Sequence, residues 1–480
     1  MFRMRTIWWA LLVLGMSLGA TAQDQDKDSS QSQPQNPVPA PAFGQNAPIL
    51  DPENPPVTGL DQPGLELRTA TRSFISPAIQ LSESAQTNGA NQLGNNDLES
   101  VGRVLGALDL QQFWPKSDLF LEYLGGGAFY SSPYDVAQLQ AFGVDAVTRW
   151  RTGQLTLRDS FSYLPDGSFQ IGYGGTPGLG FANGGIGGLL GGIPGEEQFG
   201  NGAKDAIGDY PRLANTGVLD AVQAITPRSA ITVAGGFANA HFFDSNCSVQ
   251  GDLCLINSDQ ITAQGGYSHL LNRHDQIGVI YAFQLFQFPD VAGGQIYIHI
   301  ANVRWSHTIN GRLSLIVGVG PQYIELEQGG YYKKWSPSAK VQLRYKLGHA
   351  SIVATYEKFT SAGSGFFLGA DTQVGRLGYK RPLARTWDFY ADLTYSNNKR
   401  LEISETFGAV GATSYNDGSA GVVFRKHLGR TFDFFGSYRF SELAFNAPPD
   451  VPGISGRGRI VQQHVGTIGV EWHPAPTRIE

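Results

Sequence analysis

The chain is poor in cysteine, in charge and in long apolar runs, and each shortage excludes a class of protein. Its 480 residues include two cysteines, its charged residues make up 16%, and its net charge is −6. A charged fraction below the usual value of about 25% and the lack of a basic excess argue against a nucleic-acid partner. Beyond the first residues, no apolar run approaches the roughly 20 residues that a spanning helix needs.

Motifs of catalysis and cofactor binding are also lacking. The nine histidines are scattered, and the sequence contains neither H-E-x-x-H nor G-x-S-x-G. The glycine-rich run at 172–192 lacks the Lys-Ser/Thr ending of a phosphate-binding loop. We therefore predict no enzyme activity, no cofactor and no metal site. A hydrolase pair assembled across strands is kept as the least favoured alternative.

The N-terminal residues are typical of a targeting segment. Arg3 and Arg5 precede a short apolar stretch at 7–18, and the small-residue pattern before Gln23 predicts a signal peptide, 1–22, cleaved near Ala22. Residues 23–67 are rich in Pro and Gln and cannot bury a core, so we expect a disordered periplasmic tail that acts as a spacer. A tether is the alternative.

The two cysteines, Cys247 and Cys254, are close together in the sequence, with Gly251 and Asp252 between them able to form a turn. In an exported chain this spacing predicts a disulfide within a loop. A metal site is disfavoured, because His241 alone could not complete the set of ligands.

The amphipathic hairpin at 424–441 shows the pattern that the rest of the chain repeats. In its second strand Phe432, Phe434 and Tyr438 share one face, whereas Asp433 and Arg439 share the other. An alternation with a period of two indicates a strand. A soluble sandwich would bury the aromatic face, whereas a membrane barrel would turn it toward lipid and enclose the charges.

Alternating short turns and long loops favour the membrane barrel. The short turns contain Pro, Gly or Asn with a basic residue, and lie at 115–117, 151–153, 227–228, 272–274, 310–312, 347–349, 382–385 and 427–430. The connections between them are longer and polar, as in outer-membrane barrels with short periplasmic turns and long external loops.

The number of strands follows from the same pattern. We count seventeen strands between Val101 and Trp472, and an even number requires one more, which we assign to 68–81 despite Pro77. We therefore predict an all-β, antiparallel up-and-down transmembrane barrel of about eighteen strands, with sixteen as the fallback, over 68–473, followed by a C-terminal tail at 474–480. A wall this wide leaves a lumen that holds water unless a loop plugs it.

Most tryptophans beyond the signal segment lie near the short-turn ends of strands, and Trp335 lies on the long-loop side. Because indole rings prefer membrane interfaces, this bias predicts one aromatic girdle. Its members are Trp114, Trp150, Trp305, Trp387 and Trp472.

Two sets of polar residues are candidates for the lumen. The wall set carries both signs of charge, which argues against strong ion selectivity, and comprises Lys340, Arg344, Asp388, Asp392, Asp433 and Arg439. The loop at 164–215 is the third external loop in this count, the loop that narrows the pore of general porins. By that analogy we expect a constriction formed by Glu196, Glu197, Lys204, Asp205 and Asp209. An external loop outside the pore is the alternative.

The region from 68 to 472 resembles the outer-membrane β-barrel proteins of diderm, Gram-negative bacteria and is porin-like. The stretch at 76–84, with those at 101–110 and 122–130, is similar to a poorly characterised group of acidobacterial barrels. The resemblance implies an outer-membrane location, with membrane lipid and the barrel-assembly machinery as partners. Such barrels usually end on an aromatic residue, whereas here residues 473–480 follow Trp472.

Three functions remain open at this point. The first is passive diffusion of small hydrophilic solutes through the lumen. The second is a structural or adhesion barrel that the 164–215 loop plugs. The third, a hydrolase, has no motif to support it. Small residues on the outer faces permit a homo-oligomer but do not require one.

Overall fold

The structure is a computed structural model, and all the residues that it describes belong to one compact unit, 41–480. Nothing below concerns the structure of the other residues. The described residues are 59–60, 62–63, 73–87, 98–131, 136–164, 212–243, 256–291, 293–310, 312–327, 331–363, 367–401, 412–446 and 460–479.

Within these ranges the chain forms eighteen long antiparallel strands and one short one, with no helix among them. None of the described residues forms a helix that is long and apolar enough to cross a bilayer. The strands are β1 (Phe74–Thr87), β2 (Leu98–Phe113), β3 (Ser117–Tyr130), β4 (Val136–Trp150), β5 (Gly153–Leu164), β6 (Arg212–Thr226), β7 (Ser229–Phe242), β8 (Ser258–Leu270), β9 (Asp275–Gln287), β10 (Gln295–Asn310), β11 (Leu313–Glu327), β12 (Tyr331–Leu347), β13 (Ala350–Ser361), β14 (Ala370–Ala384), β15 (Trp387–Arg400), β16 (Ser414–His427), β17 (Phe432–Phe445), β18 (Ile460–Trp472) and β19 (Thr477–Arg478).

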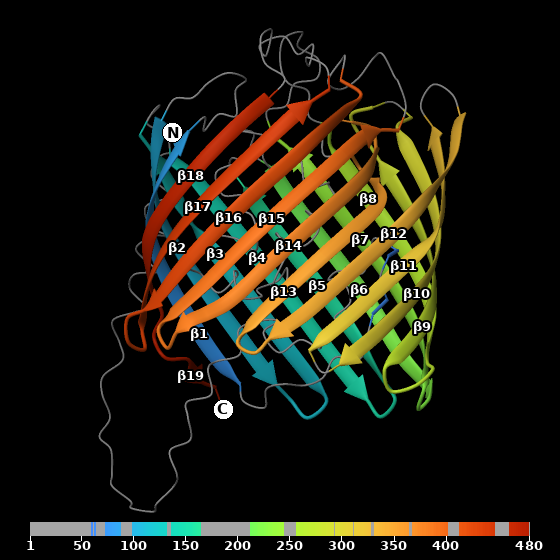
Figure 1. Cartoon of the computed structure of the whole chain (residues 1–480), viewed down its shortest axis with the longest axis horizontal. Helices are drawn as coiled ribbons and strands as arrows, with labels where there is room; N and C mark the ends of the chain where they lie inside the picture. Colours follow the sequence, from blue (N-terminus) through green and yellow to red (C-terminus); the bar gives the residue numbers. More distant parts are fainter. Residues whose placement is uncertain are drawn as a thin grey trace, which may run out of the picture. The chain divides into compact units, whose positions relative to one another are not determined.

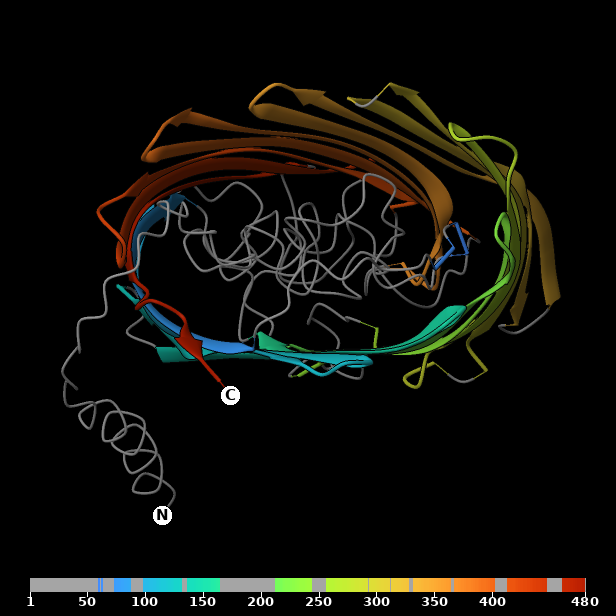
Figure 2. The same cartoon turned by 90° about the horizontal axis from the view of Figure 1, so that it is seen from below.

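The sheet closes on itself. Each long strand pairs with its sequence neighbours, and β1 pairs with both β2 and β18. Figure 1 shows the tilted strands from the side, and Figure 2 shows the closed ring that they form. A closed ring leaves no sheet edge exposed, which a β-protein in a bilayer requires. The predicted barrel of eighteen strands is confirmed, and the first strand begins at Phe74 rather than at residue 68.

Pro77 lies inside β1, although proline has no N–H to donate to a neighbouring strand. It is paired with Leu108 of β2, whereas the pairing of β1 with β18 begins only at Ile79. On that side the next paired residue is Ile75, which meets Thr477 of β19. Pro77 therefore sits in the gap between β18 and β19, where a missing N–H costs little.

The end of the chain returns to the wall. Thr477 and Arg478 pair with Ile75 and Phe74 of β1, and the N–H of Ile479 donates to the carbonyl of Ser73 at 3.0 Å. Part of the segment that we expected to be a C-terminal tail thus extends the sheet beside β1 (Figure 1).

The short turns lie where the sequence predicts them, at the lower end of the barrel in Figure 1. At the β16–β17 turn the backbone of Gly429 has a φ of 91°, a left-handed conformation that residues with a Cβ rarely adopt. The N–H of Leu428 donates to the carbonyl of Phe432 at 2.7 Å and closes this turn.

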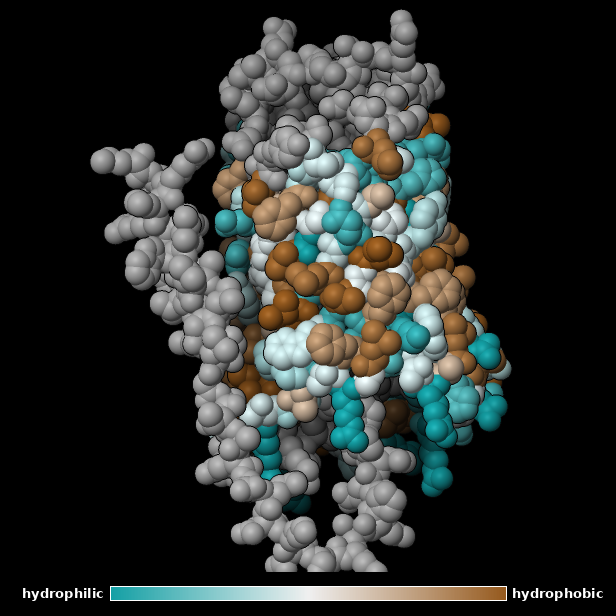
Figure 3. Space-filling model, turned by 90° about the vertical axis from the view of Figure 1, so that its left-hand side faces the viewer, coloured by the Kyte–Doolittle hydropathy of each residue, from teal (hydrophilic) through white to brown (hydrophobic). Residues whose placement is uncertain are grey.

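The barrel is apolar on its outside. Val279, Leu393 and Ile468 are 53%, 52% and 61% exposed, and many other large apolar side chains also face outward. Figure 3 shows such side chains gathered across the middle of one face, with hydrophilic ones below them. An exposed apolar surface of this extent would be a liability in water and matches the hydrocarbon of a bilayer. The amphipathic strands therefore turn their apolar faces outward and their polar faces inward, as the membrane-barrel interpretation predicts.

Candidate functional site: the inner wall of the barrel

The inward faces of the strands carry the polar side chains of the wall. On β12, Val341 and Leu343 are exposed on the outer face, while Ser338 and Lys340 are buried on the inner one. The segment at 217–225, whose facing the sequence leaves open, places Leu219 outward and Asp220 inward. The candidate functional site is thus the inner wall as a whole, and many of its charged residues form three groups.

The first group is an ion pair between neighbouring strands. Lys340 of β12 lies directly opposite Glu357 of β13, and their Nζ and Oε1 atoms are 2.6 Å apart. Only 5% and 6% of the two side chains is exposed. Since an unpaired charge is costly to bury, each residue makes the burial of the other possible.

The second group joins four strands, β15 to β18, near the short-turn end. Arg425 of β16 lies 3.5 Å from a carboxylate oxygen of Asp433 and 3.6 Å from one of Glu471. His427 binds Asp433 through Nδ1 at 2.8 Å and Asp388 through Nε2 at 3.1 Å. Asp433 and Glu471 are directly opposite each other on β17 and β18, so the cations between them offset the repulsion of like charges.

His473 adds a titratable group beside this network, just beyond the end of β18. Its Nε2 lies 3.5 Å from Oδ1 of Asp433. The interaction with that carboxylate raises the pKa of His473 above the ordinary 6.5, because the carboxylate stabilises the protonated ring. Among the described residues, no group of His, Cys, Asp and Glu is arranged to hold a metal ion.

The third group lies on β3 to β6. Arg158 of β5 is 2.7 Å from Asp220 and 3.6 Å from Asp145, and Arg149 is paired with Asp118. Each group brings acidic and basic side chains together across neighbouring strands. The three groups therefore combine charges of both signs, and none of them presents a surface of a single sign.

The six predicted lumen residues all lie on inward faces of their strands. Lys340, Asp388 and Asp433 belong to the groups above, and Arg439 donates from Nη2 to Oγ of Ser419 at 3.0 Å. Asp392 lies opposite Gly421, whose missing side chain leaves room for its carboxylate, and Arg344 lies opposite Ser314. That this face meets water stays a prediction.

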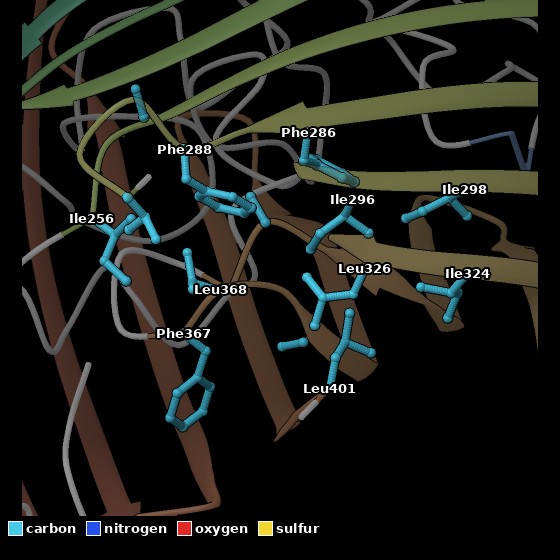
Figure 4. Packing of buried hydrophobic residues seen from close by; sticks show 14 of the residues in the cluster. Ile256, Phe286, Phe288, Ile296, Ile298, Ile324, Leu326, Phe367, Leu368 and Leu401 are labelled. Carbon is cyan, nitrogen blue, oxygen red and sulfur yellow. The ribbon is translucent and has the colours of Figure 1, made fainter. Parts of the chain in front are cut away.

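An apolar cluster inside the long-loop end of the barrel is a feature that sequence reasoning missed. Phe288 and Phe367, from the connections between β9 and β10 and between β13 and β14, pack against inward side chains of the strands (Figure 4). The cluster also includes Ile256, Phe286, Ile296, Ile298, Ile324, Leu326, Leu368, Leu401, Tyr415, Leu443 and Phe445. Inward apolar residues such as Ile296, Ile298 and Ile300 on β10 were the available signal.

Residues of the predicted tail also reach the inner wall. Leu60 is 1% exposed and packs with Phe359 and Val374, and the Nδ2 of Asn302 donates to the carbonyl of Gly59 at 3.0 Å. The expected disordered tail over 23–67 therefore does not describe these residues. The other predicted functional residues, namely Cys247 and Cys254 and the constriction set Glu196, Glu197, Lys204, Asp205 and Asp209, lie outside the described residues.

The five girdle tryptophans lie at or near the short-turn ends of their strands. Trp150 donates from Nε1 to Gln223 at 2.8 Å and Trp305 donates to Asp275 at 3.0 Å, so both indoles point their polar edge to interfacial partners. Trp114 and Trp472 are exposed, and Lys426 lies over the ring of Trp387.

A second aromatic row runs across the outer face nearer the long loops. It crosses β9 to β12 through Tyr281, His299, Tyr323 and Trp335, with ring centroids 6.3, 6.4 and 4.9 Å apart. The sequence prediction of a single girdle missed this row, because its members are mostly Tyr and His rather than Trp.

One serine–histidine pair bears on the hydrolase alternative. Ser229 Oγ lies 2.9 Å from Nδ1 of His269, and the hydroxyl of Tyr267 donates to Ser229 at 3.1 Å. The three side chains share the outward face at the short-turn end, as does the exposed Ile231. A catalytic triad also needs an acidic group that orients the histidine. Among the described residues, no acidic side chain hydrogen-bonds to His269.

Neither a family model nor a curated protein matches the chain. Its structure is similar to that of OccK2 (OpdF) of Pseudomonas aeruginosa, with a TM-score of 0.42 and 11% identity over 84% of this chain and 99% of that one. OccK2 in complex with glucuronate gives 0.41 and 11% over 85% and 98%. The outer membrane protein opdK of the same organism gives 0.38 and 10% over 84% and 98%. The expected similarity to acidobacterial barrels stays a prediction.

Proposed function

We propose that the chain is an outer-membrane, porin-like channel for passive diffusion of small hydrophilic solutes. The observation that carries this proposal is the inverted polarity of a closed wall of eighteen strands, apolar outside and charged inside. Side chains can fill a barrel of about eight strands, whereas barrels of 16 to 18 strands leave an aqueous channel. Charged inner residues would be a needless cost in a wall that enclosed no water.

The pairing of the inner charges supports weak ion selectivity. Lys340 faces Glu357, Arg158 faces two aspartates, and Arg425 lies between Asp433 and Glu471. Because opposite charges a few ångströms apart cancel at a distance, a passing ion meets local dipoles rather than a ring of one sign. Neutral solutes and ions of either sign are therefore the proposed cargo.

The protein is located in the outer membrane. The N-terminal pattern supports export with cleavage of a signal peptide near Ala22. The apolar outer surface supports insertion into outer-membrane lipid by the barrel-assembly machinery. A homo-oligomer is compatible with the outer face and is left as part of the proposal.

A structural barrel is the second candidate, and one observation favours it. The apolar cluster around Phe288 and Phe367 and the buried Leu60 both occupy space inside the ring of strands. If such contacts fill the whole cross-section, the barrel conducts nothing and its role is structural or adhesive.

Swelling of proteoliposomes separates the two candidates. Full-length protein is refolded into vesicles, which are then diluted into isotonic arabinose, sucrose or sodium glucuronate. The channel predicts swelling whose rate falls with solute size and depends little on charge. If the protein is shown to be inserted and the vesicles do not swell in any solute, the channel is excluded and the structural barrel is supported.

The hydrolase alternative is tested at its only described serine–histidine contact. With a short-chain nitrophenyl ester and with phospholipid as substrates, we expect no turnover above that of empty vesicles. Turnover that Ser229→Ala abolishes would contradict this expectation and would make Ser229 and His269 catalytic.

A further inference from the structure

We propose that the inner wall holds a specific binding seat for a short peptide segment, and that the chain's own Gly59, Leu60, Gln62 and Pro63 occupy it and narrow the lumen. The segment consists of the described residues Gly59, Leu60, Gln62 and Pro63, called the lumenal segment below. Figure 2 shows it in blue inside the ring of strands. The narrowing rests on the proposed channel function, whereas the binding itself does not.

The seat is shaped by glycines of the wall. Gln62 lies over Gly266 of β8 and Gly278 of β9, and a Cβ added at these positions would come within 2.1 Å of its Nε2 and 2.6 Å of its Oε1. Its amide donates to the carbonyl of Val279 at 3.3 Å, and the side chain is 6% exposed. Two inward-facing glycines on neighbouring strands thus leave a recess that the Gln62 side chain fills.

The other end of the segment is held by an amide with a fixed orientation. The hydroxyl of Ser338 donates to Oδ1 of Asn302 at 2.7 Å, which turns Nδ2 of Asn302 toward the carbonyl of Gly59 at 3.0 Å. All three residues are buried, and breaking these hydrogen bonds would leave buried polar groups without partners, which is costly. Leu60 completes the seat with its side chain between Phe359 and Val374.

The segment itself is adapted to the seat. Gly59 has a φ of +74°, and a Cβ on it would lie 2.7 Å from Cβ of Ala282 and 3.1 Å from Cδ1 of Ile300. Only glycine satisfies both the backbone and the space at this point. The shapes of the two partners are therefore complementary. The wall has glycines under Gln62, and the segment has a glycine under Ile300. Such a fit on both sides distinguishes a binding site from a chance contact.

Covalent connection strengthens the binding. Only the residues between Pro63 and Ser73 separate the segment from β1, and a short tether holds a binding element at an effective concentration on the order of millimolar. Modest contacts therefore suffice to keep the seat occupied. Because the seat spans β8 to β14 on the inner wall, its occupant takes up part of the cross-section through which solute passes.

The binding is tested by cysteine protection, which needs no conduction. Leu60→Cys in the full-length, membrane-inserted protein is exposed to a small hydrophilic maleimide without reductant, and the parent chain, which carries Cys247 and Cys254, sets the background. The seat predicts slow labelling, and it predicts labelling about tenfold faster when Gly59→Ala is added, because a Cβ at this position would lie 2.7 Å from Cβ of Ala282, which cannot swing aside, so the seat opens more often. Gly265→Ala is the matched control, since a Cβ there meets nothing within 4 Å.

Labelling of Leu60→Cys as fast as that of Arg385→Cys in an exposed turn would overturn the seat, as would equal rates with Gly59→Ala and Gly265→Ala. Gly266→Ala acts at the other end of the segment, where the amide of Gln62 can shift, and should raise the rate less than Gly59→Ala does.

Single-channel recording tests the narrowing. Gly59→Ala should conduct more than the parent chain, and Gly265→Ala should match it. An unchanged conductance in a variant whose labelling has risen would overturn the narrowing alone. Absence of conductance in every variant would defeat the proposed channel, and the labelling result would still decide the seat.

Discussion

Glu357→Gln removes the negative partner of the buried ion pair on β12 and β13 with almost no change of shape. With 2.6 Å between Nζ of Lys340 and Oε1 of Glu357, Coulomb attraction at an effective dielectric constant of about 20 amounts to about 6 kcal/mol. Loss of water from both groups offsets much of this. Breaking a buried pair from one side nevertheless costs about 3–5 kcal/mol, because the remaining charge stays buried after losing the opposite charge beside it.

We expect the free energy of unfolding of Glu357→Gln to fall by roughly that amount, since only 5% and 6% of the two side chains is exposed. Tryptophan fluorescence during guanidinium unfolding from lipid vesicles measures it. In the double variant Lys340→Met with Glu357→Gln, much of the loss should be recovered, so that the two single changes are strongly non-additive.

Ion selectivity gives an independent readout of the same pair. The reversal potential in a salt gradient should move toward anions in Glu357→Gln and toward cations in Lys340→Met. Exposed ion pairs contribute less than about 1 kcal/mol. If the two single changes each lower the free energy of unfolding by less than that and add up in the double variant, and if the reversal potential does not change, the pair is neither buried nor facing the conducting path.

Three further predictions concern other parts of the barrel. Leu393→Arg on the outer face of β15 should destabilise the inserted protein by about 2–4 kcal/mol in unfolding experiments, whereas Thr394→Arg on the adjacent inward position should not; equal losses would contradict the inverted polarity. Phe367→Ala should cost about 3–5 kcal/mol within the apolar cluster and speed proteolysis of the β13–β14 connection, and unchanged proteolysis would contradict its role there. The raised pKa of His473 predicts a stabilising contribution that is complete below pH 6.5 and is lost as the pH rises through the folded-state value. The unfolding midpoint of the parent chain should therefore approach that of His473→Asn at alkaline pH, and parallel pH profiles would argue against it.

Much of the wall could be predicted because its physics is local. Alternation along 432–441 identifies the strand and its two faces, and the turn residues at 427–430 place its end. The lipid side then follows from which face is aromatic. The first strand, which contains Pro77, was predicted because a barrel of this class needs an even number of strands. Its start was predicted at residue 68, whereas the strand begins at Phe74.

Features that depend on the meeting of distant segments could not be predicted in the same way. The Pro-rich composition around Leu60 does not indicate that this residue contacts Phe359 and Val374, which are far away in the sequence. The apolar cluster likewise combines residues of four connections with several strand ends, and no one of these segments shows the cluster by itself. Pairs such as Arg425 with Glu471 require the register of β16 to β18, which a period of two alone does not supply.

The central claim is that the enclosed, charged inner wall conducts solutes across a membrane. The most direct test is planar-bilayer recording of the refolded full-length chain in potassium chloride. The account predicts stepwise, ohmic openings with weak ion selectivity. Bilayers that stay electrically silent after insertion has been verified would contradict it and leave a barrel without a channel.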